Sequence, residues 1–444
     1  QSTSRAVYQQ LSAEVEYIFI HGMGFDPHNS FSQGCAVPVL PESEFRYVLT
    51  DWHMEALGIA PRFGGEMAVT EETREERVIH IVEENPMEQI YTQLRALISK
   101  AVAARSVEYH AAQRGQTWER SVIEAKAQGV SYLVQNAIDY YDNASTENIT
   151  QRMLNLYYGT IALMEAEMLV YGDQYQKLEE IEAVTKNGHG MATFGDADAG
   201  LEEFQIGVFR QGLFQAWLSH RGVDVSEFPD SKKAAQQSSW HISLNQLLYC
   251  IPELENILLE VDDGFRPGYL LPSYDTGLNW RRGFSEETYY HRTYPGSYVN
   301  MIDLTERASE TLVNEVFRDQ TVVGPYEDNV THSRGWRVYV HHGEDQHHYD
   351  VYKTHKGLSA SMVLRPLFGL TQDWEVYAVM ILYALSIIVR YRPNLWARIC
   401  HGELDRYKAV FYQFSRVAER NMTQTFLGKL TGKRVVIRHP QGLI

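Results

Sequence analysis

The chain has 444 residues, of which 40 are basic and 57 acidic, so its formal net charge is −17. Nucleic-acid binding depends on neutralising phosphates with lysine and arginine, and this balance argues against it, except through the basic segment from Lys429 to Arg438. Hydrophobic residues make up 44% and aromatic residues 12% of the chain, which excludes a disordered protein, and the length predicts more than one domain.

Residues 1–84 are predicted to form a small mixed α/β module. Strands are expected at 15–20 and 78–82, where β-branched and aromatic residues gather. The segment between them is rich in proline, glycine and acidic residues, which predicts irregular structure.

From residue 85 onward the pattern becomes helical. Asn85 offers a capping side chain, and Pro86 suits the first position of a helix. Further helices are expected at 118–141, 149–171, 205–220, 240–259, 372–390, 395–403 and 404–430, with a partly β insertion at about 260–371. The predicted fold is therefore mainly α, with a β-containing insertion inside a helical domain at 85–444.

The apolar run at 376–389 and the cysteines indicate a cytoplasmic protein. The run has 14 residues, shorter than the roughly 20 that span a bilayer, and predicts a buried core helix. Cys35, Cys250 and Cys400 lie too far apart for a disulfide framework or a Cys-x-x-Cys metal site. We expect reduced thiols and no cofactor.

Four segments together resemble the YaaC-like family of bacterial proteins. They are Leu156-Tyr157-Tyr158-Gly159, His189-Gly190, the predicted helix QIGVFRQGLFQAWL at 205–218, and RYRPNLW at 390–396. The resemblance covers residues 85–444 and implies a helical core similar to that of HEPN-type proteins, many of which are toxins or defence ribonucleases. It implies no established reaction. Glu165 is a departure, because relatives are expected to carry a basic residue there.

Ribonuclease chemistry of the HEPN type would use an arginine followed four to six residues later by a helical histidine. Arg105 and His110 have this spacing within a predicted helix and are candidate catalytic residues. The alternative is a solvated helix face.

The glycine-bracketed histidine marks the candidate ligand site. Glycines permit close backbone approach, His189 titrates near neutrality, and Arg390 offers a guanidinium to an anionic group. The alternative, which we favour, is that His189 caps a helix while Arg390 pairs with a carboxylate such as Glu165. The candidate residues are Lys186, Gly188, His189, Gly190, Tyr157, Tyr158 and Arg390.

A histidine-rich segment at 338–350 predicts a hairpin in which His341 faces His348 and His342 faces His347. Cross-strand imidazoles can hold zinc or nickel, although a solvated hairpin tip has the same composition. The aromatic residues of the last helices are expected in the core and not on a base-stacking platform; they are Trp374, Tyr377, Tyr383, Tyr391 and Trp396.

The expected function is that of a non-catalytic interaction or regulatory subunit of a larger bacterial assembly, with anti-phage defence or stress as candidate settings. A protein partner or self-association is expected, and no membrane. The alternative is a HEPN-like ribonuclease or another enzyme centred on His189 and Arg390.

Overall fold

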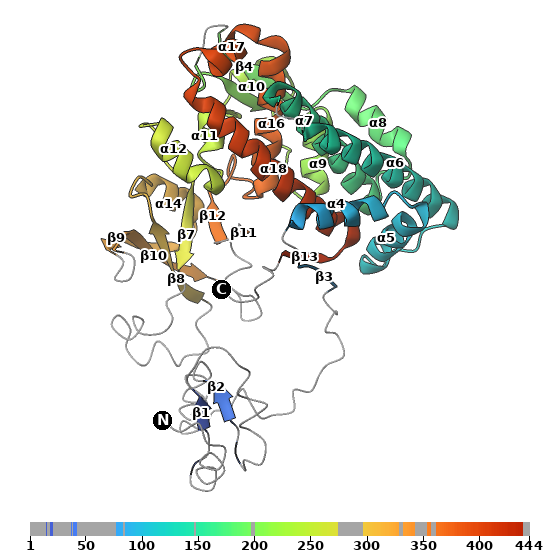
Figure 1. Cartoon of the computed structure of the whole chain (residues 1–444), viewed down its shortest axis with the longest axis horizontal. Helices are drawn as coiled ribbons and strands as arrows, with labels where there is room; N and C mark the ends of the chain where they lie inside the picture. The colour runs from blue at the N-terminus through green and yellow to red at the C-terminus, as the bar shows by residue number, and fades with distance from the viewer. Residues whose placement is uncertain are drawn as a thin grey trace. The chain divides into compact units, whose positions relative to one another are not determined.

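The computed structural model of the chain describes residues 15, 18–20, 37, 39–41, 77–82, 85–145, 148–196, 200–273, 296–327, 332–341, 353–356 and 361–437 (Figure 1). The chain divides into two compact units, Gln1–Glu75 and Glu76–Ile444. In the first unit, strand β1 (Ile18–Ile20) pairs in parallel with β2 (Val39–Pro41).

The second unit is mainly helical, which confirms the predicted fold class. Helix α7 lies at its centre and packs against α5, α6, α16 and α18. The larger helices are α4 (Pro86–Ala96), α5 (Lys100–Gln113), α6 (Arg120–Ala144), α7 (Ile149–Tyr171), α8 (Leu178–Lys186), α9 (Leu213–His220), α16 (Trp374–Tyr391), α17 (Pro393–His401) and α18 (Arg406–Thr431). Side chains around the whole circumference of α7 are buried, as expected for a helix that is apolar on every side.

Both ends of α7 are fixed by polar side chains. At its start, the Asn148 side chain accepts hydrogen bonds from the backbone N–H groups of Thr150 (3.0 Å) and Gln151 (3.3 Å). At its end, the buried Lys126 ammonium donates to the carbonyls of Leu169 (3.0 Å) and Gly172 (2.6 Å). A cation there complements the negative end of the helix dipole.

Helix α16 is the apolar core helix that the sequence predicts. Within the described ranges, it alone is long and apolar enough to cross a membrane, and 72% of it is buried inside the protein. It packs against α7, where the rings of Tyr383 and Tyr157 lie 6.0 Å apart. The apolar helix and the tyrosine-bearing helix are therefore packed against each other.

Two expected helices are wrong. Residues 205–220 begin as strand β5 (Gln205–Val208), pass through Gly212 at a φ of +96°, and only then form α9. An L-residue with a side chain rarely adopts that φ, so the glycine ends any continuous helix. Residues 240–259 are interrupted at Pro252, before which Ile251 is extended, as the residue preceding a proline tends to be. The segment forms β6 (His241–Ser243), α11 (Leu244–Leu248), a 3₁₀ turn η2 (Pro252–Leu254) and α12 (Glu255–Val261).

Strand β5 is the middle strand of an antiparallel sheet ordered β4-β5-β6, in which β4 is Met191–Phe194. Its pairing joins Met191 to Val208 and Gln205 to Ser243. The short helix α10 (Lys232–Gln236) packs beside β4 and β5. The sheet therefore fixes the residues that follow His189 against the start of α9.

The β-containing insertion forms a six-stranded sheet ordered β11-β12-β7-β8-β10-β9. The strands are β7 (Tyr269–Ser273), β8 (Gly296–Asp303), β9 (Thr321–Glu327), β10 (Arg334–His341), β11 (Thr354–Lys356) and β12 (Ser361–Leu364). Helix α14 (Glu310–Val316) joins the strands in a separate hydrophobic core around Trp336 and Leu312.

The basic C-terminal segment is largely built into the fold. Lys429 lies in the last turn of α18, and Arg434 begins strand β13 (Arg434–Ile437). This strand pairs in parallel with β3 (Val78–Ile81), which belongs to the second unit. Arg438 lies outside the described residues.

Candidate functional site

The loop before β4 connects the candidate histidine to α9. Gly188 and Gly190 have φ values of +98° and +78°. The carbonyl of Gly188 accepts a hydrogen bond from the Leu213 N–H, and that of His189 from the Phe214 N–H, each at 3.0 Å. These are first-turn donors of α9, which have no partner within the helix itself. The backbone of His189 therefore caps a neighbouring helix, as the favoured alternative predicts. The imidazole of His189 takes no part in this cap.

The His189 imidazole lies beside two tyrosine rings. Its centroid is 5.7 Å from that of Tyr157 and 5.9 Å from that of Tyr383. Within the described part of the chain, its Nδ1 atom and the Tyr157 hydroxyl are both buried without a hydrogen-bond partner. Burial, and then the positive charge of Arg390, lower the pKa of His189. The ring is therefore neutral at pH 7.

Arg390 lies in the last turn of α16 and is held by neutral groups. Its Nη1 donates to the Tyr158 hydroxyl (2.9 Å), its Nε to the Ser386 carbonyl (3.1 Å) and its Nη2 to the Ser386 hydroxyl (3.2 Å). No carboxylate among the described residues lies within 4 Å of it. Glu165 instead accepts from the Thr185 hydroxyl (2.6 Å). The expected Arg390–Glu165 pair is not formed.

Around Arg390, three helices contribute tyrosines to one surface. The Arg390 guanidinium lies 5.7 Å from the Tyr158 ring centroid and 4.9 Å from that of Tyr391. Tyr140 of α6 stacks on Tyr158 at 5.6 Å. Tyr140 and Tyr391 are 38% and 65% exposed. We call Tyr140, Tyr158, Arg390 and Tyr391 the tyrosine–arginine surface.

Tyr391 was expected in the core, and that expectation is wrong. The other four aromatic residues of the last helices are buried. Tyr391 is the final residue of α16, where the apolar face of the helix has ended. Tyr140 was not singled out from the sequence; its neighbour Tyr141 points into the core, and a rotation of 100° per residue carries Tyr140 to the outside.

The structure does not bring Arg105 and His110 together on one face of α5. Arg105 is exposed, whereas His110 is buried and its Nε2 lies 3.2 Å from the Leu430 carbonyl. Five residues correspond to about 140° around a helix, which separates the two side chains. Burial lowers the pKa of His110 to about 4. Lys186 is exposed at the end of α8.

The predicted metal site falls mostly outside the described residues. His341 is the last residue of β10 and pairs with Gly296 in the sheet. His342, His347 and His348 are not described. Within the described ranges, no group of three or more histidine, cysteine or acidic side chains is arranged to hold a metal ion.

The fold and this site define a mainly helical protein with a β subdomain and a solvent-facing cluster of tyrosine and arginine. The family model described as YaaC-like Protein matches residues 96–430, so the chain belongs to the YaaC-like family. Searches of curated proteins and of solved structures returned no match.

Proposed function

We propose that the protein is a cytoplasmic, non-catalytic interaction subunit that binds an acidic segment of a partner protein at the tyrosine–arginine surface. The observation that carries this proposal is the state of Arg390. Its guanidinium is oriented by Tyr158 and Ser386, yet no described carboxylate within 4 Å neutralises it. A partner carboxylate would complete a charge-assisted hydrogen bond there.

The composition and rigidity of the surface favour protein binding. Tyrosine and arginine are enriched among the residues that dominate binding energy at interfaces. Tyr158 is held by Tyr140 on one side and by Arg390 on the other, so little side-chain entropy remains to be lost on binding. The surface is thus ordered before any partner arrives.

Charge complementarity selects an acidic partner. Arg392 follows the surface in sequence and uses one Nη2 hydrogen bond to the Gly195 carbonyl (3.1 Å). Lys186 is exposed at the end of α8, three residues before His189. These cations are local exceptions on a chain whose net charge is −17. An acidic segment gains attraction at this surface, and the rest of the chain repels it less than it would a polyanion such as RNA.

Site-specific photo-crosslinking tests the proposal in cells. A photoreactive residue replaces Tyr391, and a second variant carries it at Tyr412, an exposed tyrosine of α18. We expect position 391 alone to capture a discrete protein through a peptide rich in aspartate and glutamate. Capture of only a second copy of the chain, or the same capture from both positions, would overturn the proposal.

The purified partner then permits a matched comparison. Arg416 also donates to a tyrosine hydroxyl, that of Tyr412 at 2.9 Å, on an exposed helix face. Arg390→Gln is expected to weaken partner binding at least about tenfold, or roughly 1.4 kcal/mol, whereas Arg416→Gln leaves it unchanged. Equal affinities for the two variants would contradict the assignment.

An enzymatic alternative rests on the closeness of His189 and Arg390. A neutral imidazole beside a guanidinium is an arrangement found in phosphodiester chemistry. Incubation of the purified protein with labelled RNA distinguishes the alternatives. We expect intact RNA; cleavage that disappears in His189→Ala would establish a ribonuclease and refute the non-catalytic proposal.

A further inference from the structure

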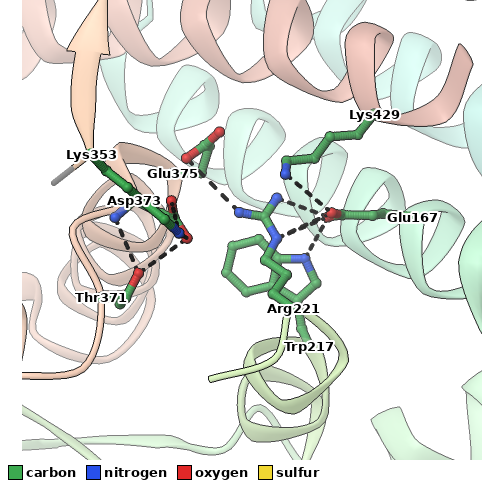
Figure 2. A network of polar contacts seen from close by, with 8 residues as sticks. All are labelled: Glu167, Trp217, Arg221, Lys353, Thr371, Asp373, Glu375 and Lys429. Atoms are coloured by element: carbon green, nitrogen blue, oxygen red, sulfur yellow. Dashed lines mark hydrogen bonds and ion pairs between the residues drawn. The ribbon is translucent and has the colours of Figure 1, made fainter. Parts of the chain in front are cut away.

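A second polar cluster lies near the other end of α7, around Glu167 (Figure 2). The Glu167 carboxylate accepts hydrogen bonds from Trp217 Nε1 (2.7 Å), Arg221 Nη2 (2.9 Å) and Arg221 Nε (3.1 Å). The Glu167 and Arg221 side chains are only 4% and 5% exposed. Burial raises the pKa of Glu167, but Arg221, Lys429 and the hydrogen bonds together lower it below its ordinary value. The pair is therefore ionised.

A cavity of about 270 Å³ opens beside this pair, and its charges do not balance. Among the described residues it is lined by four cationic side chains and two carboxylates, together with Tyr171 and His220. One carboxylate, Glu167, is taken up by Arg221, and the other, Asp373, accepts from the Lys353 ammonium (2.9 Å). Arg114 and Lys429 are left without a carboxylate at hydrogen-bond distance.

Arg114 and Lys429 have weak or neutral partners. Arg114 donates to the Tyr171 carbonyl and lies 5.2 Å from the centroid of the Tyr171 ring, with no described carboxylate within 4 Å. The Lys429 ammonium is 3.7 Å from Glu167, beyond hydrogen-bond distance. Arg221 Nη1 is buried without a hydrogen-bond partner in the described part of the chain, and its nearest carboxylate, Glu375, is 3.9 Å away.

His220 adds an uncharged imidazole to this lining. Its pKa is lowered to about 4, chiefly by burial and further by Arg114, Arg221 and Lys126, against the opposing effect of Glu167. The ring is neutral at pH 7 and can donate one hydrogen bond without adding charge. The cavity lining thus contains donors of several kinds.

A larger cavity, of about 370 Å³, shares Lys353 and Asp373 with the first. Its lining includes the amides of Gln372, Asn421 and Gln424 and the carboxylates of Asp373 and Glu375. It also includes Trp374, which is 4% exposed and whose Nε1 has no hydrogen-bond partner among the described residues. The lining of each cavity therefore includes one residue, Arg221 or Trp374, that has a buried N–H donor without an acceptor among the described residues.

We propose that the two adjoining cavities, which share Lys353 and Asp373, together bind a small phosphorylated metabolite. Its phosphoryl group lies among Arg114, Arg221 and Lys429, and its polar, oxygen-rich body occupies the larger cavity and accepts from Trp374 Nε1. A phosphoryl group supplies the acceptor oxygens and the negative charge that these donors lack. The adjoining cavities have the size of ordinary small-molecule sites. This site is independent of the tyrosine–arginine surface.

Calorimetric titration at constant ionic strength tests the phosphoryl half, with inorganic phosphate as the probe. We expect Arg114→Gln to weaken phosphate binding at least about tenfold. Arg120→Gln is the matched control, since it removes the same charge from a side chain that is 92% exposed and paired with Glu124. Absence of phosphate binding to the unaltered protein, or equal weakening by both substitutions, would overturn the proposal.

Titrations with ribose 5-phosphate and with ribose test the proposed role of the larger cavity. Ribose 5-phosphate is expected to bind at least about tenfold tighter than inorganic phosphate, and ribose alone not measurably. Trp374→Phe keeps an aromatic ring but removes Nε1, so it should abolish the gain and leave phosphate binding intact. A thermal melt checks that the variant is folded. Equal affinity of the two phosphates for the unaltered protein would refute the role of the larger cavity.

Discussion

Helix α7 contributes to two polar clusters, each of which holds an arginine, but the partners and the burial of the two arginines differ. Tyr158 holds Arg390, and Glu167, nine residues later, holds Arg221. Nine residues correspond to about half a turn of rotation and roughly 14 Å along a helix, so the two clusters lie on opposite faces of α7. Arg221 is buried and paired with a carboxylate, whereas Arg390 is partly exposed and held by hydroxyl and carbonyl groups.

The difference separates an arginine that the fold requires from one that the fold merely orients. A buried ion pair leaves an uncompensated charge when one partner is removed, which costs about 3–5 kcal/mol. A surface arginine held by neutral groups costs about 1 kcal/mol or less when it is removed. The two clusters should therefore separate folding from binding when each is altered.

The largest expected effect comes from Glu167→Gln. It leaves Arg221 buried with only the distant Glu375, so the free energy of unfolding should fall by about 3–5 kcal/mol in urea titrations. Glu124→Gln is the control, because its partner Arg120 is exposed, and it should change the free energy by less than about 0.5 kcal/mol. Similar losses of unfolding free energy for the two variants would show that the buried Glu167–Arg221 pair contributes no more to stability than an exposed pair.

The next effect concerns the loop that carries His189. A Cβ at Gly212 would lie 2.3 Å from the Gly188 carbonyl oxygen, a backbone contact that cannot relax locally. We expect Gly212→Ala to destabilise the protein by about 2–4 kcal/mol, from strain and clash together. Gly222 has a similar positive φ but open space, so Gly222→Ala should cost only about 1 kcal/mol. Equal losses of unfolding free energy for the two variants would mean that the backbone of Gly188 is not packed closely against Gly212.

Acid should weaken the fold through histidines that are buried near both clusters. The pKa values of His189 and His220 are lowered by burial, so the unfolded chain binds protons first as the pH falls below 6.5. Both contributions are complete above pH 6.5 and are lost as the pH falls below it, that of His220 as the pH falls towards 4. Between pH 6.5 and 5, the free energy of unfolding should fall by about 1–2 kcal/mol less in His220→Gln than in the unaltered protein. If the free energy of unfolding depends on pH in the same way in both proteins, His220 is not a cause of the acid sensitivity.

The smallest effect on stability is expected at the tyrosine–arginine surface. Tyr140→Ala removes the ring stacked on Tyr158 and should cost about 0.5–1.5 kcal/mol more than Tyr132→Ala. Tyr132 is 54% exposed and has no ring partner among the described residues. Because stacking is not an ion-pair interaction, the difference should persist in 1 M salt. Its loss in high salt would indicate charge, not stacking, as the cause.

The sequence predicts the helical frame because local signals specify it. The apolar spacing at 149–171 locates α7, and the apolar run at 376–389 locates α16. The gathering of His189, Arg390, Tyr157 and Tyr158 follows from the packing of these two helices. That part of the site was within reach of sequence reasoning.

Other features depend on contacts that sequence patterns do not reveal. The strand at 205–208 is a strand because it pairs with β4 and β6, and apolar spacing alone suggests a helix there. Arg221 and Glu167 are 54 residues apart, so nothing local marks either as buried. Tyr140 becomes part of a surface only once the buried face of α6 is known.

The most direct test of the contrast between the two arginines is a pair of urea unfolding curves, for Arg221→Gln and Arg390→Gln. We predict that Arg221→Gln lowers the free energy of unfolding by about 3 kcal/mol or more, because Glu167 loses its principal partner. Arg390→Gln should lower it by about 1 kcal/mol or less. Equal losses, or a larger loss for Arg390→Gln, would contradict the division between a folding arginine and a binding arginine.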